Sequence, residues 1–288
     1  LAAEANPDIP MVWASGDSAW EEGESFAGLD NLGNVMTKLE YGKMIAGCAA
    51  ALTTQTGSIG YLGPLINDET RRFVNAGYLA AQYCWEEYRG ETSPLDFGVV
   101  WIGFWFNIPG VTLDPTQVAN GFFDGGADVV ISGIDTTEGL VVAGQRAEAG
   151  EQVWNVAFDY EGACDEAPDV CLGVPYFNWR PSYLELVGDA INGDFEATWD
   201  WVGPNWDDLT DPDDGGVGWI TGPGLSDANS ELLDEFIADL ASGDVDLMVG
   251  PLNNQDGSVY LADGEKVTDH QFWYTKQLLE GITGASNP

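Results

Sequence analysis

Two kinds of apolar pattern alternate along most of the chain. Residues 99–102 and 129–131 are short apolar runs rich in β-branched side chains and followed by polar or glycine-containing turns, so they predict strands. Residues 115–123 lie between them and carry apolar positions at helical spacing, with Asp114 placed to cap the helix. Residues 98–144 therefore predict a strand–helix–strand unit with parallel strands buried on both faces.

The same two patterns recur on both sides of this segment. Helices are predicted over residues 37–53, 68–89, 139–149, 181–192, 226–241 and 271–282, and strands over residues 10–13, 58–64, 153–158 and 170–175. Residues 14–35 are expected to form a loop, residues 198–216 are aromatic and acidic without a period, and residues 253–257 are typical of a hairpin turn. The alternation predicts an α/β fold with a mostly parallel sheet.

The charge of the chain excludes several classes of partner. It carries 48 acidic and 9 basic side chains in 288 residues, for a formal charge of −39. Phosphate backbones and anionic lipids would repel such a protein, so we expect no nucleic-acid partner. A hydrophobic content of 44% with 12 Trp also excludes a disordered acidic tail. A secreted protein with a hydrated surface and a protein from a salty habitat both fit this charge.

The cysteines indicate an oxidising compartment. Cys164 and Cys171 flank a polar, proline-containing loop, which predicts a disulfide and an extracytoplasmic location. Cys48 and Cys84 fall on two separate predicted helices, where buried free thiols are the simpler interpretation, so one disulfide is expected. No run approaches 18 apolar residues, so no membrane span is predicted. Leu1 is interpreted as either a processed end or an internal point of a longer protein.

No metal site or cofactor is predicted. None of the cysteine spacings matches a zinc pattern, and the single histidine, His270, has no cysteine or second histidine near it. The loop of residues 207–214 contains five aspartates, and clustered carboxylates with glycines can hold Ca²⁺. Its spacing does not fit the EF-hand loop, so we interpret it as a solvated acidic turn.

Polar and aromatic side chains follow several predicted strands. Trp105 and Asn107 follow one strand of the central unit, and Asp135 and Thr136 follow the next. Asp159 ends another predicted strand. Ligands of open α/β sheets bind beyond these carboxyl ends, and this mixture suits a small flat polar ligand better than a phosphate. Packing roles for Trp105 and Asn107, and capping roles for the others, stay open at this point.

A resemblance to a known family covers essentially the whole chain. It is carried by residues 40–47, 57–63, 77–81, 125–130, 135–139, 176–183, 250–252, 256–257 and 264–265, and by the strand that ends at Asp159. In their order and spacing, these segments resemble the basic membrane protein (BMP) family of bacterial substrate-binding lipoproteins. The best-studied members of that family bind purine nucleosides for ABC importers.

The resemblance implies a two-lobed type I periplasmic binding protein fold, in which parallel sheets flanked by helices enclose the ligand in a cleft. Residues 1–35 and 165–205 would form lobe 1, and residues 36–164 would form lobe 2. Residues 206–288 would complete the two lobes. Similar proteins begin with a further block of strands and helices that this chain lacks, so lobe 1 is expected to be truncated at its N-terminus.

The resemblance also implies roles for individual residues. Asp159 would accept hydrogen bonds from ribose hydroxyls, because its two carboxylate oxygens can meet a vicinal diol. Trp179 would stack on a flat base, an interaction worth about 1–3 kcal/mol, although core packing is the alternative. Nucleoside binders place a lysine near this point, and here Arg180 would stand in for it without being equivalent. A free nucleobase or another small aromatic ligand therefore also fits.

The function predicted from the sequence is that of an extracytoplasmic solute-binding protein of an ABC importer. Its partners would be a purine-like ligand and the transporter permease, and any lipid anchor would lie outside this chain. A ligand-sensing or surface-assembly subunit on the same fold is the alternative. A carboxylate-dependent hydrolase is a weaker one, because no GxSxG, P-loop or HExxH motif is present and one histidine leaves little scope for general-base catalysis. We therefore predict no enzymatic activity.

Overall fold

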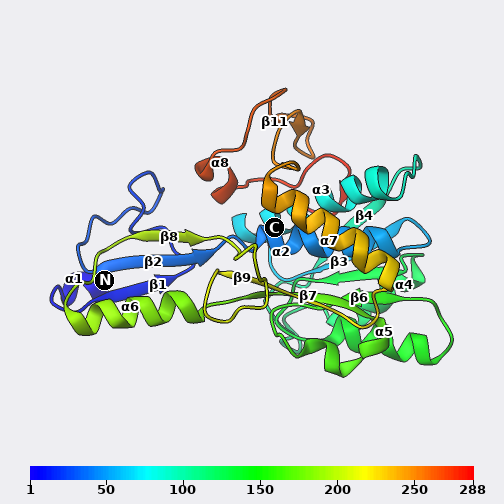
Figure 1. Ribbon diagram of the computed structural model, residues 1–288, viewed down its shortest axis with the longest axis horizontal. Coiled ribbons are helices and arrows are strands. Elements are labelled where there is room, and N and C mark those ends of the chain that lie inside the picture. The colour runs from blue at the N-terminus through cyan, green and yellow to red at the C-terminus, as the bar shows by residue number, and fades with distance from the viewer. The chain divides into compact units, whose positions relative to one another are not determined.

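The computed structural model describes residues 1–288, which divide into two units (Figure 1). Unit 1 consists of Leu1–Tyr41 and Phe177–Gly218, and unit 2 consists of Gly42–Tyr176 and Trp219–Pro288. No helix in the structure has the length and apolar character needed to cross a bilayer.

Unit 2 is built on a seven-stranded sheet. Its strands, in spatial order, are β12 (Ile282–Thr283), β4 (Asp96–Trp101), β3 (Ser58–Gly63), β5 (Val129–Ser132), β6 (Trp154–Val156), β7 (Cys171–Phe177) and β9 (Val217–Thr221). The pairs from β12 through β7 are all parallel. The predicted α/β fold with a mostly parallel sheet is therefore confirmed, with β3 lying between the two strands of the predicted central unit.

The helices of unit 2 pack on this sheet or on one another. They are α2 (Glu40–Thr53), α3 (Asp68–Tyr83), which continues as a π-helix over Cys84–Tyr88, α4 (Pro115–Asp124), α5 (Glu138–Glu148), α7 (Asp227–Ser242) and α8 (Asp269–Trp273). Four of them, α3, α4, α7 and α8, begin at a side-chain cap. Asp114 caps α4 as predicted, accepting a hydrogen bond from the Thr116 amide at 2.9 Å. Two 3₁₀ turns, Ala163–Glu166 and Pro168–Val170, and the antiparallel pair β10 (Leu252–Asn253) and β11 (Val259–Leu261) complete the unit.

The core of unit 2 is held by apolar packing and by two disulfides. Leu62, Val130 and Leu140 are completely buried between the sheet and its helices. Both Cys164–Cys171 and Cys48–Cys84 are bonded, so the expectation of one disulfide was wrong. The second bond forms because α2 and the end of α3 pack closely enough to bring the two Cα atoms to 5.3 Å.

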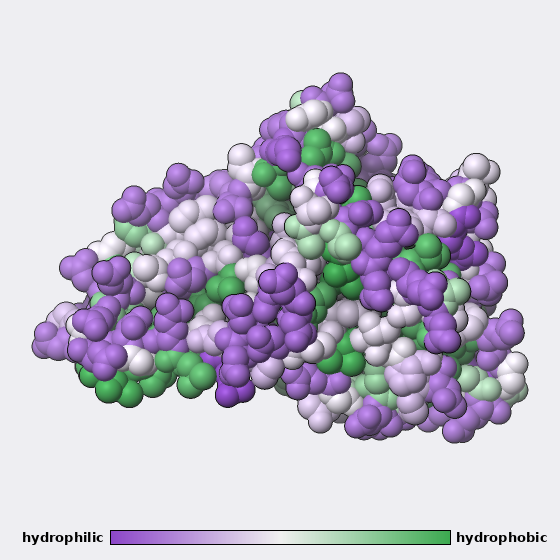
Figure 2. Space-filling model, viewed as in Figure 1, coloured by the Kyte–Doolittle hydropathy of each residue, from purple (hydrophilic) through white to green (hydrophobic).

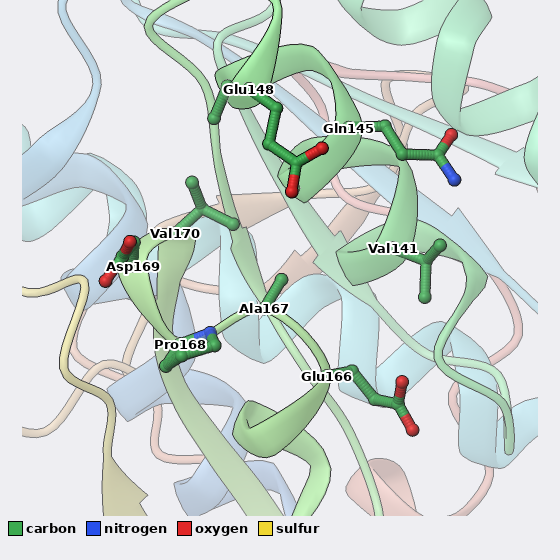
Figure 3. Close-up of a pocket in the computed structure, with 10 residues that line it drawn as sticks. Val141, Gln145, Glu148, Glu166, Ala167, Pro168, Asp169 and Val170 are labelled. Atoms are coloured by element: carbon green, nitrogen blue, oxygen red, sulfur yellow. The ribbon is translucent and has the colours of Figure 1, made fainter.

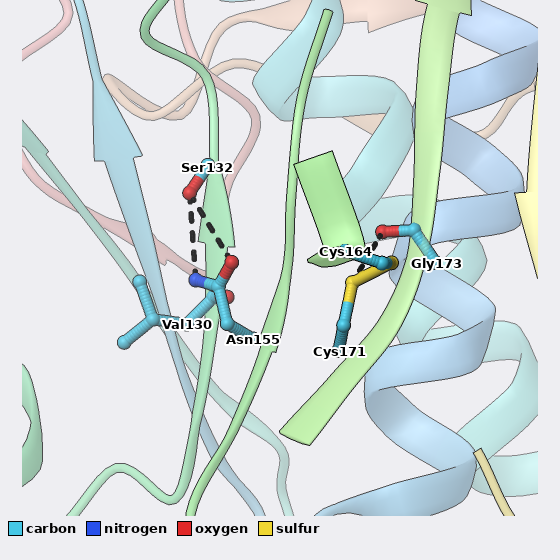
Figure 4. Close-up of a disulfide and its surroundings, with 6 residues drawn as sticks. All are labelled: Val130, Ser132, Asn155, Cys164, Cys171 and Gly173. Carbon is cyan, nitrogen blue, oxygen red and sulfur yellow. Dashed lines mark hydrogen bonds between the residues drawn. A yellow bond between two sulfur atoms is a disulfide. The ribbon is translucent and has the colours of Figure 1, made fainter. Parts of the chain in front are cut away.

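Figure 4 shows how a buried polar side chain is accommodated close to the Cys164–Cys171 disulfide. Asn155 on β6 is completely buried, and its amide donates a hydrogen bond of 2.7 Å to the Val130 carbonyl and one of 3.4 Å to Ser132 Oγ on β5. Because these groups are paired, the polar side chain does not carry the penalty of an unmet donor. The bonds also fix the ends of β5 and β6 against each other.

Unit 1 contains a three-stranded parallel sheet in the order β1 (Met11–Ala14), β2 (Leu32–Thr37) and β8 (Trp199–Val202), with helices α1 (Ala2–Ala5) and α6 (Arg180–Asn192). The expectation of a loop throughout residues 14–35 was therefore wrong, and residues 198–216 contain a strand although they show no period. Asn34 interrupts the apolar pattern of β2, yet it is buried because its side chain bonds the Ala19 amide and the Trp13 carbonyl. Because a hydrogen-bonded asparagine takes a buried position, β2 lacks the regular apolar alternation from which strands are predicted.

The apolar side of α6 is exposed on unit 1. None of its residues is buried, and Leu184, Val187 and Ile191 are 60%, 56% and 79% exposed. A groove of about 340 Å³ lies between this helix and the start of β1. Figure 2 shows the corresponding apolar patch over the region of α6.

The prediction of a C-terminal helix over residues 271–282 was also wrong, because α8 ends at Trp273 and residues 282–283 form β12. A side chain of α3 provides backbone groups of this segment with the hydrogen-bond partners that they would have had in a helix. The Asn75 side chain donates to the Gln277 carbonyl and accepts from the Leu279 amide, both at 3.0 Å. Such competition from tertiary hydrogen bonds cannot be read from local periodicity.

Two segments fall in a different unit from the one that the expected lobes imply, and the lobe assignment itself stays a prediction. Residues 36–41 belong to unit 1, and residues 165–176 belong to unit 2. Residues 206–288 are divided between the units, with residues 206–218 in unit 1 and residues 219–288 in unit 2. The reason is that β7 pairs with β6 as a parallel member of the large sheet, so the chain leaves unit 2 only at the end of β7.

Candidate ligand-binding site

Two carboxylates stand at neighbouring carboxyl ends of the unit 2 sheet. Asp135 lies three residues beyond β5, Asp159 lies three residues beyond β6, and both are exposed. Partial removal from water, together with the charge of Asp159, raises the pKa of Asp135 to about 6. Desolvation also raises the pKa of Asp159. The two carboxyl groups therefore interact electrostatically, as members of one site do.

A buried ammonium group lies beneath this pair. Lys43 on α2 is completely buried, and its Nζ donates a hydrogen bond of 2.9 Å to the Ser132 carbonyl at the end of β5. The same nitrogen lies 3.4 Å from the centre of the Phe158 ring. Burial lowers the pKa of Lys43 well below its usual range, while the charges of Asp159 and Asp135 oppose that change. The lysine in turn opposes the raised pKa of each carboxyl.

The backbone holds Asp159 in an uncommon conformation. Its φ is 70°, in the left-handed region that few residues other than glycine adopt, although aspartate enters it more readily than most. The Asp159 amide donates to the Pro175 carbonyl at 3.1 Å, which ties this turn to β7. Such conformations are concentrated at functional sites, where the surrounding structure maintains them.

The loop that follows β4 approaches the carboxylate pair. The Asp135 amide donates a hydrogen bond of 2.9 Å to the Trp105 carbonyl, which brings these two predicted site residues together. Asn107 is engaged within its own loop, where its side-chain oxygen accepts from Thr112 Oγ1 at 3.2 Å. Of the residues predicted in unit 2, Trp105 is thus linked to Asp135 through the backbone.

The capping alternative for Asp135 and Thr136 does not describe the structure. The N-cap of α5 is Thr137, and no side chain makes the capping hydrogen bond. Thr136 Oγ1 and Glu138 Oε2 are buried oxygens without a hydrogen-bond partner in the protein. A buried polar atom without a hydrogen-bond partner typically destabilises a protein by about 1–3 kcal/mol. The loop between β5 and α5 is therefore not arranged for helix stability alone.

Trp179 and Arg180 lie in unit 1, at the start of α6. The Trp179 ring stacks with Phe177 and Tyr183 at centroid distances of 5.1 and 5.7 Å. Arg180 forms an exposed ion pair of 3.1 Å with Asp213. Because these residues belong to the other unit, the expectation that they share one ligand with Asp159 stays a prediction.

The acidic loop of residues 207–214 is organised by Asn178. The buried side-chain amide of Asn178 donates to the carbonyls of Asp211, Asp214 and Gly215 at 3.1–3.2 Å. No cluster of three or more histidine, cysteine, aspartate or glutamate side chains in the structure is arranged to hold a metal ion.

Lys43 was missed by the sequence analysis. The available signal was a lone cation on the inward side of an apolar helix, where Leu39, Ala46 and Ala50 are its neighbours at helical spacing. A buried lysine requires a compensating charge, and charged groups in such settings are often functional. Its partners come from loops about 90 and 115 residues away, so local pattern could not identify them.

A larger groove of about 710 Å³ lies elsewhere in unit 2 (Figure 3). It runs between α5 and the 3₁₀ turns of the Cys164–Cys171 loop, where Glu148, Glu166 and Asp169 stand among apolar residues. Neither Asp135 nor Asp159 lines it. No lysine or arginine is among the residues that line this groove. It therefore lacks the pairing of negative and positive charge found around Lys43.

The chain is similar to known binding proteins. No protein-family model matches the chain. A purine-binding protein of Brucella abortus is 25% identical over 264 residues, which cover 92% of this chain and 68% of that protein. The chain is thus similar over most of its length to a protein described as purine-binding. This confirms the resemblance to solute-binding proteins that the sequence indicated.

A second relative is a Haloferax volcanii protein assigned as TsgA13, the glucose-binding protein of an ABC transporter. It is 24% identical over 187 residues, which cover 65% of this chain and 44% of that protein. The chain therefore matches less than half the length of this relative. The two relatives are described with different ligands, so homology supports a solute-binding role without identifying the solute.

Solved structures show the fold. An ABC-transporter solute-binding protein of Aeropyrum pernix matches with a TM-score of 0.65 and 13% identity, over 85% of this chain and 72% of that one. A similar protein of Conexibacter woesei matches with a TM-score of 0.54 and 18% identity, over 85% and 73%. The type I periplasmic binding protein fold predicted from the sequence is thereby confirmed.

Proposed function

We propose that this protein is the solute-binding component of an ABC importer and that it binds a purine-like ligand at the carboxyl edge of the unit 2 sheet. The observation that carries the proposal is the exposed carboxylate pair, Asp135 and Asp159, above the buried Lys43. The homology to a purine-binding protein supports the ligand class. The permease of the importer is the partner implied by this function.

The carboxylates provide hydrogen-bond acceptors for the ligand. Ribose hydroxyls and the exocyclic amino group of a purine are donors, and hydrogen bonds to an ionised carboxylate are stronger than neutral ones. Trp105, whose backbone is bonded to Asp135, offers an aromatic ring on the loop above β4. Trp179 and Arg180 stay proposed ligand contacts of unit 1, together with Thr136 and Asn107 in unit 2.

We propose binding without chemistry. Two carboxylates could in principle hydrolyse a glycosidic bond, which gives this proposal a direct check. Incubation with adenosine or inosine should leave the nucleoside intact by chromatography. Release of free base at a rate that Asp159→Asn abolishes would instead identify a hydrolase.

The proposed location is extracytoplasmic. Both disulfides lie in unit 2, and disulfides persist mainly in oxidising compartments. Solute-binding proteins act on the side of the membrane from which the solute is imported, so the compartment agrees with the proposed role.

Calorimetric titration tests the ligand and its site together. The probes are adenine, adenosine, guanosine and glucose, and we expect binding of a purine by the wild-type protein. Asp159→Asn keeps the shape of the side chain and removes its charge, so affinity should fall about 10–100-fold, because a hydrogen bond to a charged group contributes about 1.5–3 kcal/mol.

Asp165→Asn is the matched control, because it removes one exposed carboxylate from the same unit, away from the strand ends. Its affinity should equal that of the wild type. Equal affinity of Asp159→Asn and wild type would contradict the proposed site, and absence of binding by any purine would contradict the proposed ligand class.

A further inference from the structure

The Lys43 ammonium group lies between two strand ends of the unit 2 sheet. Its hydrogen-bond acceptor, Ser132, is the last residue of β5 and lies three residues before Asp135. The ring that it faces, Phe158, directly precedes Asp159. One buried nitrogen therefore contacts both segments that carry the site carboxylates.

We propose that Lys43 is a positioning residue of the ligand site, acting as the buried counter-charge that presents Asp135 and Asp159 together as ionised acceptors. This inference rests on the proposed function and adds the residue that controls the site. Lys43 is 0% exposed, so it acts on the ligand through the two carboxylates.

The energetic reason is the balance of charges in this part of unit 2. An isolated ammonium group in an apolar interior is strongly disfavoured, and two carboxylates close together repel each other. Placing the cation below the pair offsets both penalties. Electrostatic interactions with Asp159 and Asp135 then offset part of the cost of burying Lys43, although burial remains the larger effect on its pKa.

Other titratable groups around the lysine do not replace it. Tyr61 on β3 lies with its ring centre 5.7 Å from the ammonium nitrogen, and burial raises the pKa of its phenol, so it stays neutral. Glu69 on α3 interacts with Tyr61, and Glu138 begins α5 after the Asp135 loop. Among the groups that interact with the carboxylate pair, Lys43 supplies the positive charge.

A dependence on pH follows from this arrangement. Protonation of Asp135 removes an ionised acceptor, so ligand affinity should decrease as the pH falls through about 6, where this carboxyl titrates. Without Lys43, both carboxyl groups lose a favourable positive charge and take up protons at higher pH. The decrease in affinity should then begin at higher pH.

The first test compares Lys43→Met with Arg72→Met. Arg72 is the matched control, because it is also a buried cation of unit 2, and its Nη1 donates to the Trp273 carbonyl at 3.1 Å. The charge that lowers the pKa of both carboxyl groups is that of Lys43. Both variants should lose thermal stability. Only Lys43→Met should raise the Asp135 pKa, measured by carbon NMR on the ligand-free protein, by about one unit or more, which corresponds to a tenfold change in proton affinity.

The same variants are then titrated with purine across the pH range. Lys43→Met should shift the midpoint of the affinity profile upward with the Asp135 pKa, and Arg72→Met should leave the profile unchanged. An Asp135 pKa that is the same in wild type and Lys43→Met would overturn the proposal. If Lys43 had a purely structural role, Lys43→Met would lose stability as Arg72→Met does. Neither the Asp135 pKa nor the midpoint of the affinity profile would then change.

A second measurement applies even if Lys43→Met does not fold. Coupling between titrating groups is reciprocal, so Asp159→Asn and Asp135→Asn should each lower the pKa of Lys43, followed through its side-chain NMR signals. An unchanged Lys43 pKa in both variants would refute the coupling. Because these titrations need no ligand, a wild type that binds no purine would contradict the proposed function separately from this inference.

Discussion

Asp135 shows how a residue of the proposed site can reduce the stability of the fold that contains it. Its pKa is about 6 in the folded protein, above the value near 3.9 expected in the unfolded chain. The folded state therefore binds more protons between these values, and the contribution of this group to stability declines as the pH rises from about 4 to about 6. Above about 6 the full penalty of the ionised carboxylate is present.

Asp135→Asn should consequently stabilise the protein near pH 7.5 and have little effect near pH 4, where the wild-type carboxyl is already neutral in the folded state. Thermal unfolding of both proteins over this pH range measures the difference in their stability. The contributions of the other acidic groups are the same in both proteins and cancel in this difference. A gain of equal size at both pH values, or a loss near pH 7.5, would show that the carboxylate is not under electrostatic strain.

At the scale of elements, α2 and α3 are packed so closely that one of their contacts requires glycine. A Cβ added to Gly47 would overlap the carbonyl of Gly77, whereas a Cβ added to Gly121 on α4 would meet no atom within 4 Å. The Cys48–Cys84 disulfide joins the same two segments. This contact also matters for the site, because α2 carries Lys43 four residues before Gly47.

Gly47→Ala should lower the free energy of unfolding by about 1–3 kcal/mol, the usual effect of overpacking a core. Gly121→Ala is the control with the same chemical change and should be neutral or stabilising by up to about 1 kcal/mol, as expected for alanine in an open helix position. Urea unfolding under oxidising conditions measures both. Equal effects of the two substitutions would mean that α2 and α3 can move apart to fit the added methyl group with no loss of stability.

The elements also show what the sequence could predict. Most of the helices and strands of unit 2 were found because their apolar periods are regular and their caps, such as Asp114 and Ser226, are local. β2 was missed because Asn34 is buried by hydrogen bonds, and the C-terminal segment was mistaken for a helix because Asn75 provides distant partners. For the site, strand ends indicated Asp135 and Asp159, but Lys43 becomes visible only when the sheet brings three distant segments together.

At the scale of the whole molecule, the fold alone does not decide the function. A transcriptional activator of Bacillus halodurans shares it with a TM-score of 0.59 at 14% identity, over 84% of this chain and 73% of that one. The role of this protein is therefore argued from its carboxylate pair and from its solute-binding relatives.

The net charge of −39 predicts a dependence on salt. Repulsion among the carboxylates opposes the folded state, and added ions screen it over a distance of about 10 Å at 0.1 M. Thermal unfolding in increasing KCl should show a midpoint that rises with salt, most steeply at the lowest concentrations. A midpoint that stays constant or falls would show that this repulsion does not limit stability.

The central claim is that a purine-like ligand donates hydrogen bonds to the carboxylate pair at the ends of β5 and β6. The most direct measurement is the pKa of Asp135, followed by carbon NMR with and without saturating ligand. Donors that contact an ionised carboxylate favour that form, so the account predicts a decrease from about 6 on binding. An Asp135 pKa that does not change while the ligand is bound would contradict the account.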